Sequence, residues 1–189
     1  LEPNPATYKI LQANSQLNQG LTNIAPINAA AMSEDGGYVF QYNEASLMNG
    51  GYQRGISRLK HASFYKIDVK GFNLSQLLTK NYSDRLKNLK FIKTDLEGSD
   101  YMVFLTIKDI IIQYMPVIQS EINGVMPRSV RVDYIKELKA IGYSIFSLNS
   151  EMLDSIQILT RAMINSKDTF DIFAIPTNML EKFKDLNIK

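Results

Sequence analysis

Residues 91–98 read Phe91-Ile92-Lys93-Thr94-Asp95-Leu96-Glu97-Gly98, and this stretch carries the clearest signal for the fold. A short apolar run that ends in acidic residues is typical of a β-strand followed by a turn. Ser99 or Asp100 can then cap a helix that runs to about Tyr114. The next apolar run, Val117–Glu121, again ends in an acid. The sequence from 89 to 121 therefore predicts strand, helix, strand.

The same alternation extends in both directions. Asn4-Pro5 is a good helix start, because Asn is a preferred cap and Pro suits the first helical position. We expect helices at about 5–20, 74–78, 130–141 and 179–186, and strands at about 23–31, 38–42, 63–69, 143–148 and 170–175. This order predicts an α/β fold with a mostly parallel sheet and helices on both faces, built as a single domain over residues 1–189.

Composition excludes several classes of protein. Of the 189 residues, 45% are hydrophobic and 21% charged, which is ordinary for a soluble globular domain. A net charge of +2 is too small to indicate nucleic acid or an anionic membrane as partner. The absence of cysteine excludes a disulfide framework, a thiolate nucleophile and a cysteine-based zinc site. No apolar run approaches the roughly 20 residues of a membrane span, and we expect a cytoplasmic protein.

Acidic residues follow three of the expected strands. They are Glu2, the pair Asp95 and Glu97, and Glu121. Ligands of open α/β sheets bind at the carboxyl ends of the strands. A carboxylate there can accept ribose hydroxyls, hold a metal or act as a base. Such acids also serve as helix caps or solvated loop residues, and that alternative stays open for each of them.

Six segments, in order, resemble the FkbM family of S-adenosylmethionine-dependent methyltransferases. Two of them are Leu1–Pro5 and residues 91–98, whose most specific parts are Glu2-Pro3-Asn4-Pro5 and Asp95-Leu96-Glu97-Gly98. The others are Asn28–Ser33, Pro116–Glu121, Gly142–Phe146 and Phe170–Pro176. The resemblance covers nearly the whole chain and implies a Rossmann-like class I methyltransferase fold with S-adenosylmethionine as cofactor. It implies methylation of a hydroxyl on a small molecule or glycan.

The resemblance also implies roles for individual residues. Glu2 would hold the ribose hydroxyls of the cofactor, while Ala30 and Ala31 would lie against its adenine. Asp95 would lie close to the methyl donor and acceptor and could accept the hydroxyl proton. Glu97 completes the same motif, and Gly98 permits a tight turn into the next helix. Glu121 matches a family acid at the edge of the fifth strand. The implied catalytic residues are thus Asp95, Glu97 and Glu121, and no metal ligand is implied.

The chain departs from the family at its front. The family's glycine-rich loop, which joins the first strand to the first helix, has no counterpart, because the ribose acid is already residue 2. Gly50-Gly51 cannot replace it, since these residues follow the third expected strand. We therefore expect an N-terminally incomplete domain whose first strand and glycine loop lie upstream of Leu1.

Two other functions remain open. The missing glycine loop favours a truncated, non-catalytic binding module. The spacing of Asp95 and Glu97 is also found in metal-dependent nucleotide-sugar transferases. His61, the single histidine, is better explained as a surface residue than as a catalytic one. Residues 43–58 form either a substrate lid or an ordinary surface connection, and 43–62 and 149–169 are expected to shape the acceptor pocket.

Overall fold

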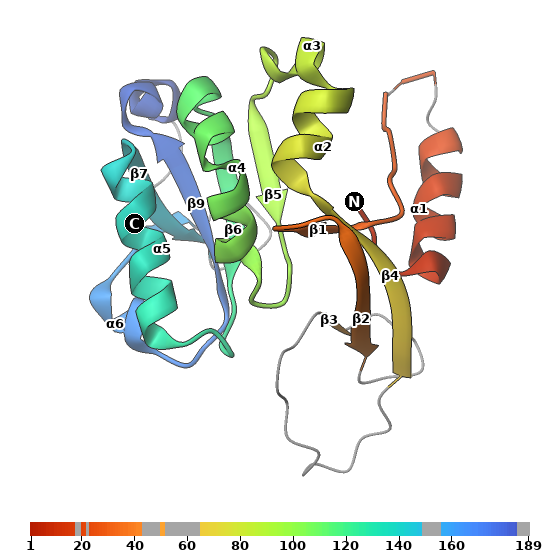
Figure 1. The fold of residues 1–189 in the computed structure, drawn as a ribbon. Coiled ribbons are helices and arrows are strands. Elements are labelled where there is room, and N and C mark those ends of the chain that lie inside the picture. Colours follow the sequence, from red (N-terminus) through yellow and green to blue (C-terminus); the bar gives the residue numbers. More distant parts are fainter. Residues whose placement is uncertain (18–19, 22, 43–49, 52–64, 149–155, 185–189) are drawn as a thin grey trace. The chain divides into compact units, whose positions relative to one another are not determined.

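The computed structural model describes the chain except for residues 18–19, 22, 43–49, 52–64, 149–155 and 185–189 (Figure 1). Contacts divide the chain into two compact units, Leu1–Leu77 and Leu78–Lys189. That residues 1–189 form a single domain therefore stays a prediction. His61 and most of the 43–62 segment lie outside the described residues.

The first unit begins with helix α1, Pro5–Leu17. Asn4 starts it as predicted, because its Oδ1 accepts a hydrogen bond of 2.9 Å from the backbone N–H of Ala6. The Asn4 side chain is almost fully buried, with 1% of its surface exposed. The cap is therefore part of the interior of this unit.

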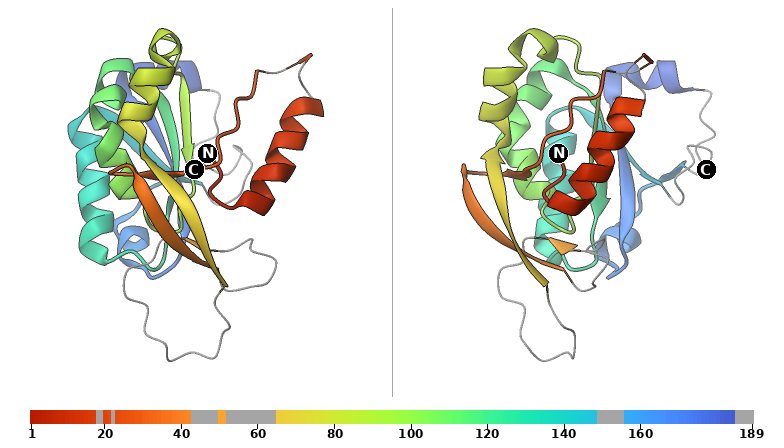
Figure 2. Two further views of the ribbon diagram at one scale, coloured as in Figure 1. Left: turned by 45° about the vertical axis from the view of Figure 1, so that its right-hand side comes forward. Right: turned by 90° about the vertical axis from the view of Figure 1, so that its right-hand side faces the viewer.

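A four-stranded sheet follows α1. Its strands are β1 (Ala30–Met32), β2 (Gly36–Tyr42), β3 (Gly50–Gly51) and β4 (Tyr65–Asn73), in the order β1-β4-β2-β3. Only β1 and β4 pair in parallel, whereas β2 is antiparallel to both β3 and β4. β2 and β4 form one long, curved ribbon (Figure 2). Its core consists of Ala30, Phe40, Tyr42 and Val69.

The second unit contains most of the helices. Helix α2, Leu74–Asn81, spans the boundary between the units. The following elements are α3 (Ser83–Leu86), β5 (Phe91–Thr94), α4 (Asp100–Tyr114), β6 (Val117–Ile122), α5 (Arg128–Ala140), β7 (Tyr143–Leu148), β8 (Ile156–Ile158), α6 (Arg161–Asn165), β9 (Phe170–Pro176) and the 3-10 helix η2 (Thr177–Phe183).

The sheet of the second unit has the strand order β5-β6-β9-β7-β8. β5 and β6 pair in parallel, joined by α4. β9 lies antiparallel between β6 and β7, and β8 is antiparallel to β7. The prediction of a mostly parallel, Rossmann-like sheet is therefore wrong, although the α/β class is confirmed. Both sheets are mixed, because a strand's apolar pattern does not encode the direction of its neighbour.

The two faces of this sheet are covered differently. Side chains alternate along β6, so Ile118 and Ser120 point to one face and Val117 to the other. Tyr134 of α5 contacts Ser120, which places α5 on the first face. On the second face, η2 packs its apolar side chains against the cluster of Val117, Leu148, Ile156, Phe173 and Ile175.

Most predicted elements of the second unit exist with small shifts of boundary. Gly142, predicted to end α5, has φ +95°, a left-handed conformation that glycine adopts without strain. The strand expected at 23–31 is reduced to Ala30–Met32, and the helix expected at 179–186 is a 3-10 helix. β8 and α6 were not predicted. Among the described residues, no helix combines the length and apolarity required to cross a bilayer.

Candidate functional site

The turn after β5 adopts an uncommon backbone conformation. Glu97 and Gly98 both have positive φ, at 52° and 96°. Glycine adopts a positive φ without strain, but this conformation is rare and strained for a residue with a side chain, such as Glu97. A Cβ on Gly98 would lie 3.1 Å from Cγ2 of Val125. The predicted tight turn at Gly98 is thus confirmed, and it holds Glu97 in a fixed orientation at the end of the strand.

A buried carboxylate supports this turn from the start of α4. Asp100 is fully buried, and its Oδ2 accepts a hydrogen bond of 3.2 Å from the backbone N–H of Leu96. Burial raises the pKa of Asp100, an effect opposed by hydrogen bonds from backbone N–H groups, including that of Leu96. Ser99 occupies the cap position without a side-chain cap. Asp100 therefore ties the turn to the helix.

The hydroxyl of Ser120 on β6 links β5, α4 and α5. Ser120 Oγ accepts hydrogen bonds from Thr94 Oγ1 at 2.9 Å and from the Tyr134 hydroxyl at 3.1 Å. It lies 3.4 Å from Asp100 Oδ1, to which it donates. Burial raises the pKa of Tyr134, so this phenol stays protonated as a donor. The network fixes the carboxyl ends of β5 and β6 relative to each other.

The side-chain amide of Asn123 contacts two carboxylates. Asn123 Nδ2 donates to Glu121 Oε2 at 2.8 Å and to Glu97 Oε2 at 3.2 Å. Asn123 Oδ1 accepts the N–H of Val125 at 3.0 Å. Only 8% of the Asn123 surface is exposed, so its amide has little freedom to turn away.

Glu121 is the group whose acidity is most clearly shifted toward neutral pH in this cluster. Burial raises its pKa to about 6, the hydrogen bond from Asn123 opposes this, and the negative charges of Asp95, Glu97 and Asp100 raise it further. A carboxyl group with a pKa near 6 is half ionised close to neutral pH, where general acid–base catalysis is most effective. The arrangement can accept a proton from a bound hydroxyl group.

The residues predicted from the sequence fall into two sets. Asp95, Glu97 and Glu121 belong to the second unit; the two partly buried glutamates share the amide of Asn123, and the charge of the exposed Asp95 acts on Glu121. Glu2, Ala30 and Ala31 belong to the first unit. Sequence reasoning missed four supporting residues, namely Ser120, Asn123, Arg131 and Tyr134. Polar residues at strand ends or on an amphipathic helix carry no signal that separates these from surface positions.

Glu2 is held by its own chain segment. Its Oε1 accepts the N–H of Asn4 at 2.8 Å, and its backbone N–H donates to the carbonyl of Ile27 at 3.0 Å. Asn28 Nδ2 donates to the backbone carbonyl of Glu2 at 2.9 Å. Burial and the negative charge of Glu2 raise the pKa of Tyr42 to about 12.

Ala30 and Ala31 lie in β1, opposite Gly71 and Phe72 of β4. Ala30 is 4% exposed and Ala31 is intermediate. Ala30 is thus part of the core of this sheet, and Ala31 is the more exposed of the two.

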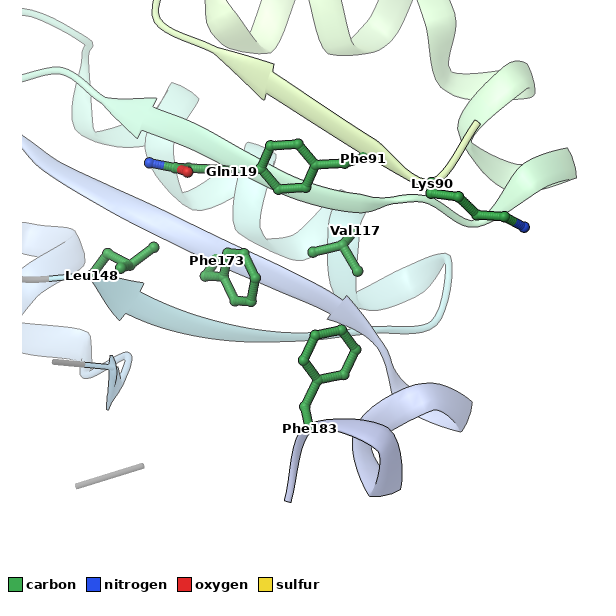
Figure 3. A pocket seen from close by; sticks show the side chains of 7 residues that line it. All are labelled: Lys90, Phe91, Val117, Gln119, Leu148, Phe173 and Phe183. Atoms are coloured by element: carbon green, nitrogen blue, oxygen red, sulfur yellow. The ribbon is translucent and has the colours of Figure 1, made fainter. Parts of the chain in front are cut away.

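An apolar pocket of about 460 Å3 lies on the second face of the five-stranded sheet (Figure 3). Val117, Gln119 and Glu121 alternate to the same face of β6, so the pocket shares its face with Glu121. Gln119 Nε2 donates to Asp171 Oδ2 at 2.8 Å, which holds its amide against β9. The lining consists of Lys90, Phe91, Val117, Gln119, Leu148, Phe173 and Phe183.

The described part of the chain contains no group of three or more histidine, cysteine, aspartate or glutamate residues arranged to hold a metal ion. Comparison with protein-family models, with curated proteins and with solved structures found no match to this chain.

Proposed function

We propose that the chain is an S-adenosylmethionine-dependent methyltransferase that acts on a hydroxyl oxygen. The observation that carries this proposal is the grouping of Glu97 and Glu121 around the amide of Asn123, with the charge of Asp95 acting on Glu121. It provides a proton acceptor at the carboxyl ends of two adjacent parallel strands, where α/β proteins bind ligands. The six-segment resemblance to the FkbM family supplies the class of reaction.

The surroundings of Glu2 fit the ribose of such a cofactor. Its carboxylate is oriented by the N–H of Asn4, and each carboxylate oxygen can accept more than one hydrogen bond. A vicinal diol presents two donors to such a group. The resemblance assigns the adenine to Ala30 and Ala31, of which Ala31 is the more exposed. When bound, the cofactor supplies a methyl group on a positively charged sulfur, which leaves as a neutral thioether.

Within the second unit, the acids act on the acceptor. As the acceptor oxygen forms its bond to carbon, its proton passes to a carboxylate. Glu121 suits this step best, because its pKa of about 6 matches a base that works near neutral pH. Asp95 is exposed and would assist by charge, while Asn123 orients Glu121.

The acceptor that the resemblance implies is a hydroxyl of a small molecule or a glycan; the apolar pocket is a separate feature, because Asp95, Glu97 and Glu121 are not among its lining residues. We also propose that the protein acts in the cytoplasm, in line with its lack of cysteine.

Calorimetry with S-adenosylmethionine and with its demethylated product tests the proposal. We expect saturable binding of both to the wild-type chain, and a loss of about 10-fold or more in affinity for Glu2→Gln, because hydrogen bonds to a charged group are lost. Glu34→Gln, an exposed acid in the turn before β2 of the same unit, is the matched control.

Absence of binding heat from the wild-type chain contradicts the proposal and favours the non-catalytic module. A manganese-dependent thermal shift with a nucleoside diphosphate, together with no response to S-adenosylmethionine, favours the nucleotide-sugar transferase instead.

A further inference from the structure

Arg131 of α5 is a buried cation with unusual partners. Only 2% of its surface is exposed. Its Nε donates to the carbonyl of Met126 at 3.2 Å and its Nη2 to the carbonyl of Gly124 at 2.8 Å. Its Nη1 donates to the carbonyls of Ser166 and Asp168. Taking a guanidinium out of water is costly, and these carbonyls compensate by accepting its N–H donors.

The carbonyls belong to two segments that Arg131 holds together. Residues 123–126 form a turn closed by a hydrogen bond of 3.1 Å from the N–H of Met126 to the carbonyl of Asn123. The N–H of Gly124 donates to Thr169 Oγ1 at 2.8 Å. A Cβ on Gly124 would clash with the backbone carbonyl of Lys167. The turn is therefore clamped between α5 and residues 166–169.

This turn carries the amide that orders the carboxylates. Asn123 is its first residue, and its Nδ2 donates to both Glu121 and Glu97. Because Asn123 Oδ1 is itself bound to the N–H of Val125, the direction of the amide follows the backbone of the turn.

We propose that Arg131 is a positioning residue, which holds the carbonyls of Gly124 and Met126 and thereby directs the Asn123 amide to Glu121 and Glu97. The consequence for catalysis rests on the proposed function, whereas the positioning itself does not.

The protonation of Glu121 reports on this positioning. The hydrogen bond from Asn123 favours its ionised form, and the charges of Asp95, Glu97 and Asp100 oppose it. Asp171 of β9 lies opposite Glu121 in the strand register, and it adds a further carboxyl group on this face of the sheet. If the turn loosens, the amide moves away and the pKa of Glu121 rises.

Carbon-13 NMR titration of the glutamate carboxyl groups measures this directly, with Glu121→Gln to assign the signal. We expect Asn123→Ala to raise the titration midpoint of Glu121 by about one pH unit. Arg131→Lys keeps the charge but loses the planar fork, and we expect a smaller shift in the same direction. Arg128→Lys, on the same helix but exposed and bound to Asn165, should leave the midpoint unchanged.

A double-mutant cycle separates positioning from a general structural effect. If Arg131 acts through Asn123, Arg131→Lys shifts the midpoint in the wild-type background and not in the Asn123→Ala background. Equal shifts in both backgrounds, or a folded Arg131→Lys with the wild-type midpoint, overturn the proposal.

Thr169→Val removes the hydrogen bond that holds the turn from the opposite side, and it should also raise the titration midpoint of Glu121. The proposal can therefore be tested even if the Arg131 variant folds poorly. An unchanged midpoint in folded Thr169→Val counts against the clamp. The titration needs no cofactor, so absence of S-adenosylmethionine binding contradicts only the proposed function.

Discussion

Two buried serines differ in their hydrogen bonds and in little else, and substituting each by alanine should have opposite effects on stability. Ser120 and Ser147 are both 0% exposed, and both pair with Ile172, from opposite sides of β9. Ser120 Oγ takes part in three hydrogen bonds, with Thr94, Asp100 and Tyr134. Ser147 Oγ is buried without a hydrogen-bond partner among the described residues.

The expected magnitudes follow from these partners. In Ser120→Ala the Tyr134 hydroxyl loses the acceptor described for it, and a buried unpaired donor costs about 1–3 kcal/mol. Thr94 is only partly buried and can turn to water, and the contact with Asp100 is long at 3.4 Å, so these two losses together add less than about 1 kcal/mol. We expect a total loss of about 2–3 kcal/mol in the free energy of unfolding. Ser147→Ala removes an unpaired hydroxyl and should be neutral or stabilising by about 1 kcal/mol.

Urea unfolding followed by circular dichroism and tyrosine fluorescence measures both free energies. The chain has 10 tyrosines and no tryptophan, so tyrosine emission is directly observable. For a chain of this length the loss in Ser120→Ala corresponds to a fall in Tm of about 4–12 °C. Equal m-values in the three proteins are needed to interpret the difference as stability.

The reasoning is refuted if Ser147→Ala is as destabilising as Ser120→Ala, since the cost would then come from lost packing common to both sites. A neutral Ser120→Ala would also refute it, because the network around Tyr134 would then contribute nothing.

Two further predictions concern the same unit. The pKa of Glu121 is about 6 in the folded chain, against an ordinary value of 4.5. Between these two pH values the folded state binds more protons than the unfolded state. The contribution of Glu121 to the free energy of unfolding therefore falls as the pH rises from about 4.5 through 6. This fall in stability is at most about 2 kcal/mol, and less for a partly exposed group. Urea unfolding between pH 4 and 7 should show the fall in the wild type and not in Glu121→Gln. Identical pH profiles of the two proteins would contradict the prediction. Gly98→Ala forces a side chain into φ +96° and should cost about 1–2 kcal/mol, whereas the Cβ of Gly124→Ala would clash with the backbone carbonyl of Lys167 and should cost more. Thermal melts compare them, and a Gly124→Ala protein as stable as the wild type would show that residues 166–169 yield easily.

Several local features were readable in the sequence because they depend on neighbouring residues. Asn4 and Pro5 start α1 where the capping rule places its start, and Gly142 ends α5 with a positive φ. The segments at 117–121 and 143–148 are strands, since both are short, contain β-branched or aromatic residues and lie between helix and turn signals. The gathering of Asp95, Glu97 and Glu121 also follows from local rules, once β5 and β6 are adjacent and parallel.

The directions of the strands and the supports of the site needed the tertiary structure. The pattern of Phe170–Pro176 is equally compatible with a parallel and an antiparallel strand, and only its place between β6 and β7 decides that it is antiparallel. Asn123 and Arg131 likewise look like ordinary polar residues until the chain brings residues 123–126 against 166–169. Periodicity records which side chains avoid water, because burial depends on local spacing, whereas partners distant in the chain are chosen by the packing of the whole unit.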